Sequence, residues 1–184
     1  MDKVIAEAEE RMKGAVEATQ REFAGIRSGR VTPALLDKVL VDAYDSKMPV
    51  NQLATISVPE PRLMVVSPWD RKNVPAIERA ISTSEIGLTP VVEGSIIRLP
   101  VPPLTEERRK ELAKQVQTVA EDGRVAVRNV RRDANEKIKR MEKAEHLSED
   151  EVHIGQDEIQ ELTDTYIERL DEAAEQKAEE IMEV

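Results

Sequence analysis

Cysteine is absent from this chain of 184 residues, which excludes a disulfide framework, thiol catalysis and thiolate-bound zinc. Aromatic residues make up only 2% of the chain, so few rings are available to build a ligand pocket or to stack on single-stranded bases. No stretch approaches the roughly 20 apolar residues that span a bilayer, and the N-terminal segment lacks the apolar core of a signal peptide. These absences argue against a small-molecule enzyme or a membrane protein, and they favour a cytoplasmic protein.

Catalytic and metal-binding motifs are missing as well. The only histidines, His146 and His153, flank a predicted helix start and have no third ligand at a metal-site spacing. The sequence contains neither a glycine-rich phosphate loop nor a nucleophile elbow. With 37 acidic residues, any single pair of carboxylates is uninformative. We therefore expect no catalytic residue, no metal site and no cofactor.

Charged residues, by contrast, form 35% of the chain, a composition typical of long solvated helices. Apolar residues spaced three and four apart form one stripe that predicts a helix over 5–26, and this apolar stripe stops at Gly29. The same spacing predicts a second helix over 105–141 and a third from 148 to 181. Ser148 and Glu151 have the spacing of a capping box at the start of the third helix. Each helix has to bury its apolar stripe against another helix, and the simplest arrangement that does so is a three-helix bundle.

The middle of the chain has a different pattern, with short β-branched runs broken by proline and glycine. These runs predict strands at 38–44, 62–67 and 95–101, a weaker strand at 51–58 and a short helix at 74–84.

Together the patterns predict an α+β protein with a discontinuous three-helix bundle domain at 1–30 and 104–184. A small β/α/β domain is inserted at 31–103. Two connections join the domains, near 28–31 and 100–104, and we expect hinges there, at Gly29, Pro102 and Pro103. The alternative is a plain helix stop and an ordinary loop, because glycine and proline commonly serve as both.

The net charge of −10 conceals a basic surface on the second helix. Seven basic residues fall in one sector about 100° wide beside the apolar stripe. We call them the basic ridge: Lys110, Lys114, Arg124, Arg128, Arg131, Arg132 and Lys139. The ridge is about 44 Å long at 1.5 Å per residue, and arginine suits bidentate phosphate contacts, so we expect it to bind RNA.

Two further arginines, Arg27 and Arg30, could extend this ridge. The alternative is a solvated face whose bases pair with the acidic third helix, and Glu121 is the main acid among the ridge residues. Two other functions also remain open. One is a helical RNA- or protein-interaction module, and the other is a detached helical arm of an RNA-modifying enzyme.

The ridge also carries a family resemblance, because residues 125–135 read VAVRNVRRDAN and resemble the signature of the bacterial ribosome recycling factor family. Residues 26–36 are similar to the family's helix-to-hinge segment, and residues 102–109 are similar to its return into the bundle. One departure is Tyr44-Asp45-Ser46, a turn in which the family usually has a glycine.

The resemblance implies an L-shaped, monomeric protein of about tRNA size, with a three-helix rod and a hinged β/α/β domain. It implies a non-catalytic factor that binds the post-termination ribosome. With elongation factor G and GTP, such a factor separates the subunits and releases mRNA and tRNA. Carried over by motif, Arg128, Arg131 and Arg132 contact large-subunit ribosomal RNA near the intersubunit bridges, with Arg30, Arg27 and Arg124 in support.

Overall fold

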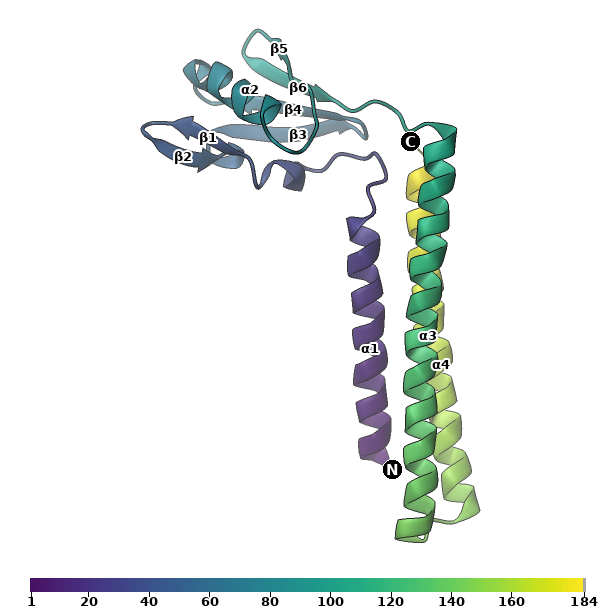
Figure 1. Cartoon of the computed structure of the whole chain (residues 1–184). Coiled ribbons are helices and arrows are strands. Elements are labelled where there is room, and N and C mark those ends of the chain that lie inside the picture. The colour runs from purple at the N-terminus through teal and green to yellow at the C-terminus, as the bar shows by residue number, and fades with distance from the viewer. Residues whose placement is uncertain (184) are drawn as a thin grey trace. The chain divides into compact units, whose positions relative to one another are not determined.

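A computed structural model describes residues 1–183 of the chain and confirms the predicted α+β fold. The chain divides into two compact units (Figure 1). A helical unit contains residues 1–28 and 106–183, and a small β-rich unit contains residues 29–105. None of the described helices is both long and apolar enough to cross a bilayer.

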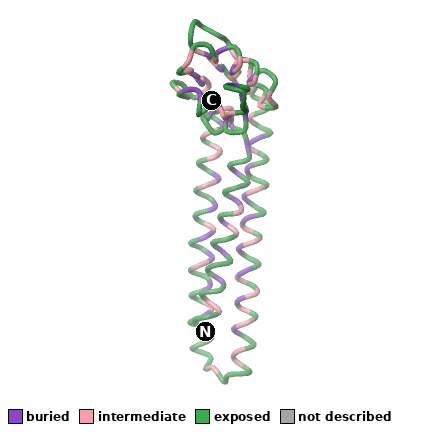
Figure 2. The backbone as a smooth tube through the Cα atoms, turned by 90° about the vertical axis from the view of Figure 1, so that its left-hand side faces the viewer, coloured by how far each residue is buried: buried purple, intermediate pink, exposed green. Residues whose placement is uncertain are grey.

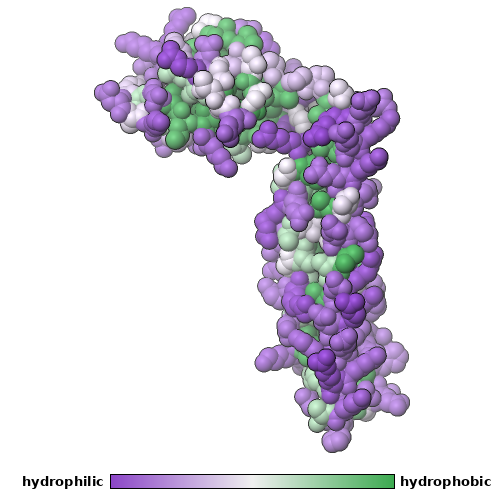
Figure 3. Space-filling view, viewed as in Figure 1, coloured by the Kyte–Doolittle hydropathy of each residue, from purple (hydrophilic) through white to green (hydrophobic). Residues whose placement is uncertain are grey.

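Three long helices build the helical unit: α1 (Asp2–Gly25), α3 (Glu106–Glu145) and α4 (Glu149–Met182). Each helix packs against the other two. Ion pairs Glu7–Lys137 and Arg11–Asp133, at 2.7 and 2.9 Å, show that α1 and α3 run antiparallel. Buried positions recur along all three helices (Figure 2), and hydrophilic side chains cover most of the face seen in Figure 3.

The ends of the helices follow from local chemistry. The capping box of α4 is present: Ser148 Oγ accepts a hydrogen bond from the Glu151 amide at 3.3 Å, and the Glu151 carboxylate accepts one from the Ser148 amide at 2.8 Å. The predicted end of α1 was wrong, because the helix stops at Gly25. Ile26 belongs to the apolar stripe and is buried, but its backbone is extended, at φ −81° and ψ 112°. Burial therefore continues beyond the helix.

The small unit is built on two antiparallel sheets. A two-stranded hairpin joins β1 (Leu40–Ala43) and β2 (Ser46–Pro49). The second sheet has the order β3-β4-β6-β5. Its strands are β3 (Ala54–Glu60), β4 (Leu63–Pro68), β5 (Val91–Glu93) and β6 (Ile96–Pro100).

One helix and three 3-10 turns complete the small unit. They are α2 (Val74–Ser82), η1 (Pro33–Leu36), η2 (Val50–Gln52) and η3 (Arg71–Asn73). Ile77 and Ile81 of α2 are fully buried in one core with Met64 of β4 and Leu99 of β6. This core is separate from that of the helical unit. β1, β3, β4, β6 and α2 coincide with predicted elements, whereas β2 and β5 were not predicted.

Candidate nucleic-acid interface

The basic ridge lies entirely on α3, a single helix of 40 residues, so the backbone fixes the spacing of its members. Most of its side chains are exposed, whereas Arg124 and Arg131 are half-buried. The motif's acid, Asp133, pairs with Arg11 of α1 at 2.9 Å and so faces away from the ridge. The ridge therefore lies on the part of α3 that neither α1 nor the core covers.

Glu121 and Asp171 bind arginines in the middle of the ridge. Arg124 Nε donates to Asp171 Oδ1 of α4 at 2.7 Å, and its Nη1 donates to Glu121 Oε2 at 2.9 Å. Arg128 Nη1 donates to the other oxygen of Glu121 at 3.0 Å. The alternative interpretation, pairing with the acidic third helix, thus applies to Arg124, whose side chain is only 21% exposed.

These contacts shift two pKa values. Hydrogen bonds from Arg124 and Arg128 lower the pKa of the Glu121 carboxyl below its ordinary value. Hydrogen bonds to Asp171 and then to Glu121 raise the pKa of the Arg124 guanidinium. Glu121 is therefore ionised at neutral pH and screens part of the charge of Arg124 and Arg128.

The C-terminal end of the ridge surrounds a shallow hollow of about 440 Å³. Its lining residues are Arg128, Asn129, Arg131, Arg132, Asn135, Glu136 and Lys139. Arg131 donates to Gln160 of α4 at 3.2 Å, a neutral partner that orients the guanidinium without cancelling its charge. Among residues 1–183, Arg131, Arg132 and Lys139 form no ion pair. Four cations thus face one acid, Glu136, which itself pairs with Arg140 at 3.7 Å.

Two asparagines in this hollow were not predicted as site residues. Asn135 falls in the same angular sector as the ridge, so the helical projection could have identified it. Its Oδ1 is buried and has no hydrogen-bond partner among the described residues. Asn129 lines the hollow beside Arg128. Amide groups between guanidinium groups add hydrogen-bonding capacity for polar groups of RNA other than phosphate.

The remaining members of the predicted site are more widely spread. Lys110 is exposed and pairs with Glu106 at 2.8 Å, one turn earlier on α3, and Lys114 is exposed. Arg27 is exposed in the segment after α1, and Arg30 belongs to the small unit. Their contribution to RNA binding stays a prediction.

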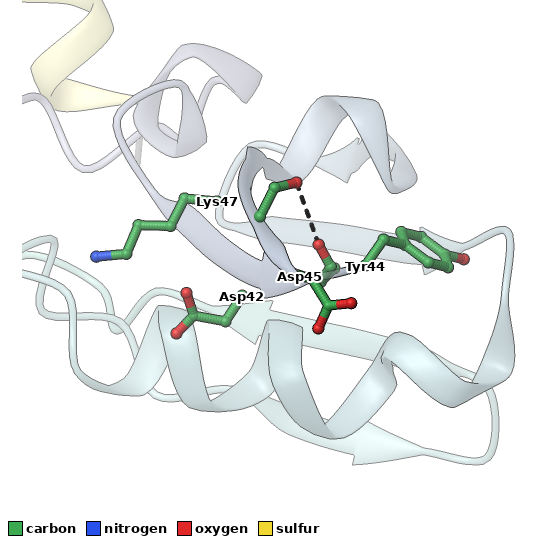
Figure 4. A pocket seen from close by; sticks show the side chains of 6 residues that line it. Asp42, Tyr44, Asp45 and Lys47 are labelled. Carbon is green, nitrogen blue, oxygen red and sulfur yellow. Dashed lines mark hydrogen bonds between the residues drawn. The ribbon is translucent and has the colours of Figure 1, made fainter.

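A second hollow, of about 550 Å³, lies at the β1–β2 turn of the small unit (Figure 4). Asp42, Asp45 and Lys47 contribute charges of both signs to its lining, with Tyr44 between the two acids in sequence. Although this hollow is larger than the one on α3, it lacks a concentration of positive charge. The hollow on α3 is therefore the better candidate for binding nucleic acid.

The two histidines and Trp69 do not form a further binding site among the described residues. His146 and His153 are both exposed, and His153 Nδ1 lies 3.6 Å from Asp157 Oδ1. No cluster of three or more metal-ligating side chains occurs in residues 1–183. The side chain of Trp69 is 68% exposed on the small unit, and its indole Nε1 donates to Thr55 Oγ1 at 2.9 Å.

A family model described as "Ribosome recycling factor" matches residues 19–182. The chain belongs to the ribosome recycling factor family. A ribosome-recycling factor of Symbiobacterium thermophilum is 57% identical over 181 residues, which cover 98% of each chain. One from Carboxydothermus hydrogenoformans is 54% identical with the same coverage.

Solved structures of ribosome recycling factors share the fold. A solution structure of a ribosome recycling factor matches with a TM-score of 0.71 and 46% identity, covering 100% of this chain and 97% of that one. A second match has a TM-score of 0.62 and 44% identity, covering 98% of this chain and 97% of the other. It represents the T. thermophilus ribosome recycling factor and E. coli elongation factor G bound to the E. coli post-termination complex.

Proposed function

We propose that this chain binds the post-termination ribosome in the bacterial cytoplasm and, with elongation factor G and GTP, separates the subunits and releases mRNA and tRNA. The family match over residues 19–182 supports this function. So does the similar T. thermophilus factor, which is bound with elongation factor G to a post-termination complex. A general interaction module outside recycling is not favoured by these relatives.

The hollow on α3 carries the proposed contact with large-subunit ribosomal RNA. Arg128, Arg131, Arg132 and Lys139 surround it on one rigid helix, and guanidinium groups bind phosphate oxygens in pairs. Arg124 supports this surface indirectly, because its guanidinium holds α3 against α4 through Asp171. Arg131, Arg132 and Lys139, which form no ion pair within residues 1–183, are therefore the primary RNA contacts in this proposal.

The chain itself has no catalytic role in this proposal. Hydrolysis of GTP belongs to elongation factor G, and this protein contributes an RNA anchor and a second unit joined to it by two linkers. The domain boundaries near 30 and 104, and hinges at Gly29, Pro102 and Pro103, are part of the proposal. In it, the helical unit holds the ribosome while partner-driven motion of the small unit strains the intersubunit bridges.

Sucrose-gradient sedimentation of purified post-termination ribosomes tests this function. The protein is added with and without elongation factor G and GTP, together with a factor that prevents subunits from reassociating. We expect free subunits only when both proteins and GTP are present. Co-sedimentation without splitting would keep the RNA anchor and reject the recycling role. Protein that stays at the top of the gradient would reject ribosome binding.

A further inference from the structure

Ser28 is a polar residue buried at the end of the helical unit, where it is 4% exposed. The other buried polar residues among those described, Thr19 and Thr163, bond to carbonyl groups four residues earlier in their own helices. Ser28 instead donates a hydrogen bond from its Oγ to Glu180 Oε1, on α4. Its burial therefore serves a contact between two distant parts of the chain.

The acceptor of this bond is itself held in place. The other oxygen of Glu180 lies 3.4 Å from Lys177 Nζ, one turn earlier on α4. The side chain of Lys177 is 12% exposed and that of Glu180 is 32% exposed, so the pair is better shielded than the surface ion pairs of α3. Both residues line a small hollow of about 260 Å³ between α1 and α4, beside Phe23. A shielded carboxylate gives a hydroxyl a stronger hydrogen bond than a neutral acceptor does.

This contact fastens residues that are no longer helical. α1 stops at Gly25, and the Ile26 amide donates to Phe23 O at 3.0 Å while its side chain is buried. Gly29 follows directly with φ +82°, a left-handed backbone conformation that glycine adopts without strain. Ser28 is thus the last residue that is hydrogen-bonded to α4 before Gly29, whose backbone has the greater conformational freedom of glycine.

On the side of the small unit, both linkers are also tied to the sheet. The Val31 amide donates to Pro61 O at 3.0 Å, and the Val101 amide donates to Arg62 O at 2.8 Å. Pro61 and Arg62 form the connection between β3 and β4, so the two linkers are held by the same turn. In the first linker, the residues that carry these bonds, Ser28 and Val31, are three positions apart in the sequence.

We infer that Ser28, Glu180 and Lys177 form a clamp that fixes the first linker to α4 and confines its bending to the residues that begin at Gly29. The clamp sets how freely the small unit moves relative to the bundle. Its use during subunit separation rests on the proposed function, but its existence does not.

Hydrogen exchange of the Ile26 amide reports on the clamp without any ribosome. A hydrogen bond to a charged group contributes enough that its loss should speed local opening about tenfold. We expect this increase in Ser28→Ala and in Glu180→Ala, and no further increase in the double variant, because the two residues act through one bond. Exchange of the Val31 amide should stay unchanged. Equal Ile26 exchange rates in the parent and both variants would overturn the clamp.

Two matched variants control for a general loss of stability. Thr163→Ala removes a buried hydroxyl of α4 that bonds to Ile159 O at 2.7 Å, and Glu179→Gln alters an exposed neighbour of Glu180. Neither should change exchange at Ile26. An increase in these controls equal to that in Ser28→Ala would also overturn the proposal.

Nitrogen-15 relaxation then tests the effect on motion between the units. We expect the rotational correlation time of the small unit to fall relative to that of the bundle in Ser28→Ala, while both units keep their folded spectra. A faster Ile26 exchange with an unchanged ratio of correlation times would overturn the role in domain motion. If the ratio falls but ribosomes are not split even by the parent protein, the clamp stands and the proposed function fails.

Discussion

Arginine has two roles along α3, and the difference depends on the partners of each guanidinium. Arg124 is largely covered and bonds to carboxylates on two helices, so its loss would weaken the packing of α3 on α4. Arg131 has only the neutral partner Gln160, and Arg132 is exposed in the same hollow. Substitutions at these positions should therefore separate stability from RNA binding.

Replacing Arg132 by alanine should weaken ribosome binding with little effect on folding. If Arg132 contacts one phosphate, the slope of log affinity against log salt should fall by about 0.7–0.9. Arg21→Ala is the matched control, because Arg21 is an exposed arginine on α1, outside the ridge and its hollow. Binding measured across a salt series checks this prediction. An unchanged slope, or an equal loss in both variants, would remove Arg132 from the RNA contact.

Replacing Glu121 by glutamine should strengthen ribosome binding, because it removes the negative charge beside Arg124 and Arg128. It should also change the acid side of the stability profile. The pKa of Glu121 is lowered in the folded state, so its stabilising effect is present above the ordinary pKa of 4.5 and is lost as pH falls through the folded pKa. The free energy of unfolding of the variant should therefore decrease less than that of the parent protein as the pH falls through this range.

Urea unfolding at a series of pH values measures this second effect. Glu145→Gln is the control, since Glu145 is an exposed acid at the end of α3. Weaker ribosome binding by Glu121→Gln would show that Glu121 orients the arginines more than it screens them.

At the scale of elements, glycine fixes how closely the helices approach. Gly123 of α3 faces α1 and α4, and a Cβ built on it would lie 2.5 Å from Thr19 Oγ1 and 3.2 Å from Leu170 Cδ2. Gly14 of α1 has nothing within 4 Å of such a position. Replacement by alanine is therefore expected to have opposite effects at Gly123 and at Gly14.

Gly123→Ala should destabilise the bundle by about 1–3 kcal/mol through overpacking. Gly14→Ala should stabilise it by about 1 kcal/mol, because alanine favours the helix and meets no neighbour. Urea unfolding followed by far-ultraviolet circular dichroism measures both. If the two variants changed the free energy of unfolding in the same direction, the close packing at Gly123 would be wrong.

The β1–β2 turn contains two non-glycine residues in left-handed conformations, Tyr44 at φ +50° and Asp45 at φ +60°. A left-handed residue other than glycine costs roughly 1–2 kcal/mol, although aspartate tolerates it better than most. Asp45→Gly should therefore stabilise the small unit by about 0.5–1 kcal/mol. Asp42→Gly, in the strand β1, should destabilise it instead. Thermal unfolding of both variants tests the turn, and a loss of stability in Asp45→Gly would contradict it.

The sequence predicts long elements well and short ones poorly, for physical reasons. The stripes of α1, α3 and α4 are visible because many buried residues repeat over each helix. β5 has three residues, all exposed, and therefore no burial pattern to detect. β2 is four residues long with none fully buried. Its hairpin was missed because the turn lacks the usual Asn-Gly signal.

The candidate site was predictable to the same extent. Periodicity alone places Arg128, Arg131 and Arg132 on one face of α3. It cannot show that Arg124 meets Asp171, because that contact depends on the register between α3 and α4. Burial along α3 shows the same limit. The spacing of Val119 fits the apolar stripe, yet Val119 is half-buried, whereas its neighbour Ala120 is fully buried.

For the whole molecule, the important feature is that, within residues 1–183, the chain passes between the two compact units twice. Each unit has its own core, so a change in a linker should alter function without unfolding either unit. Gly29, at φ +82°, is the most sensitive linker position in this respect.

Gly29→Ala should slow ribosome splitting while leaving ribosome binding intact, because a methyl group strains this backbone conformation by roughly 1–2 kcal/mol. Gly25→Ala is the control, since Gly25 ends α1 and has nothing within 4 Å of an added Cβ. Splitting rates and binding affinities of the two variants are compared. A splitting rate for Gly29→Ala equal to that of Gly25→Ala would show that Gly29 does not limit the motion.

Trp69 is the chain's single tryptophan, and it lies at the surface of the small unit. Intrinsic tryptophan emission therefore reports on one unit only, whereas the dichroism signal at 222 nm comes mainly from α1, α3 and α4. Recording both signals in one melt gives two transition curves from an unlabelled sample. Their separation measures how strongly the folding of one unit depends on the other.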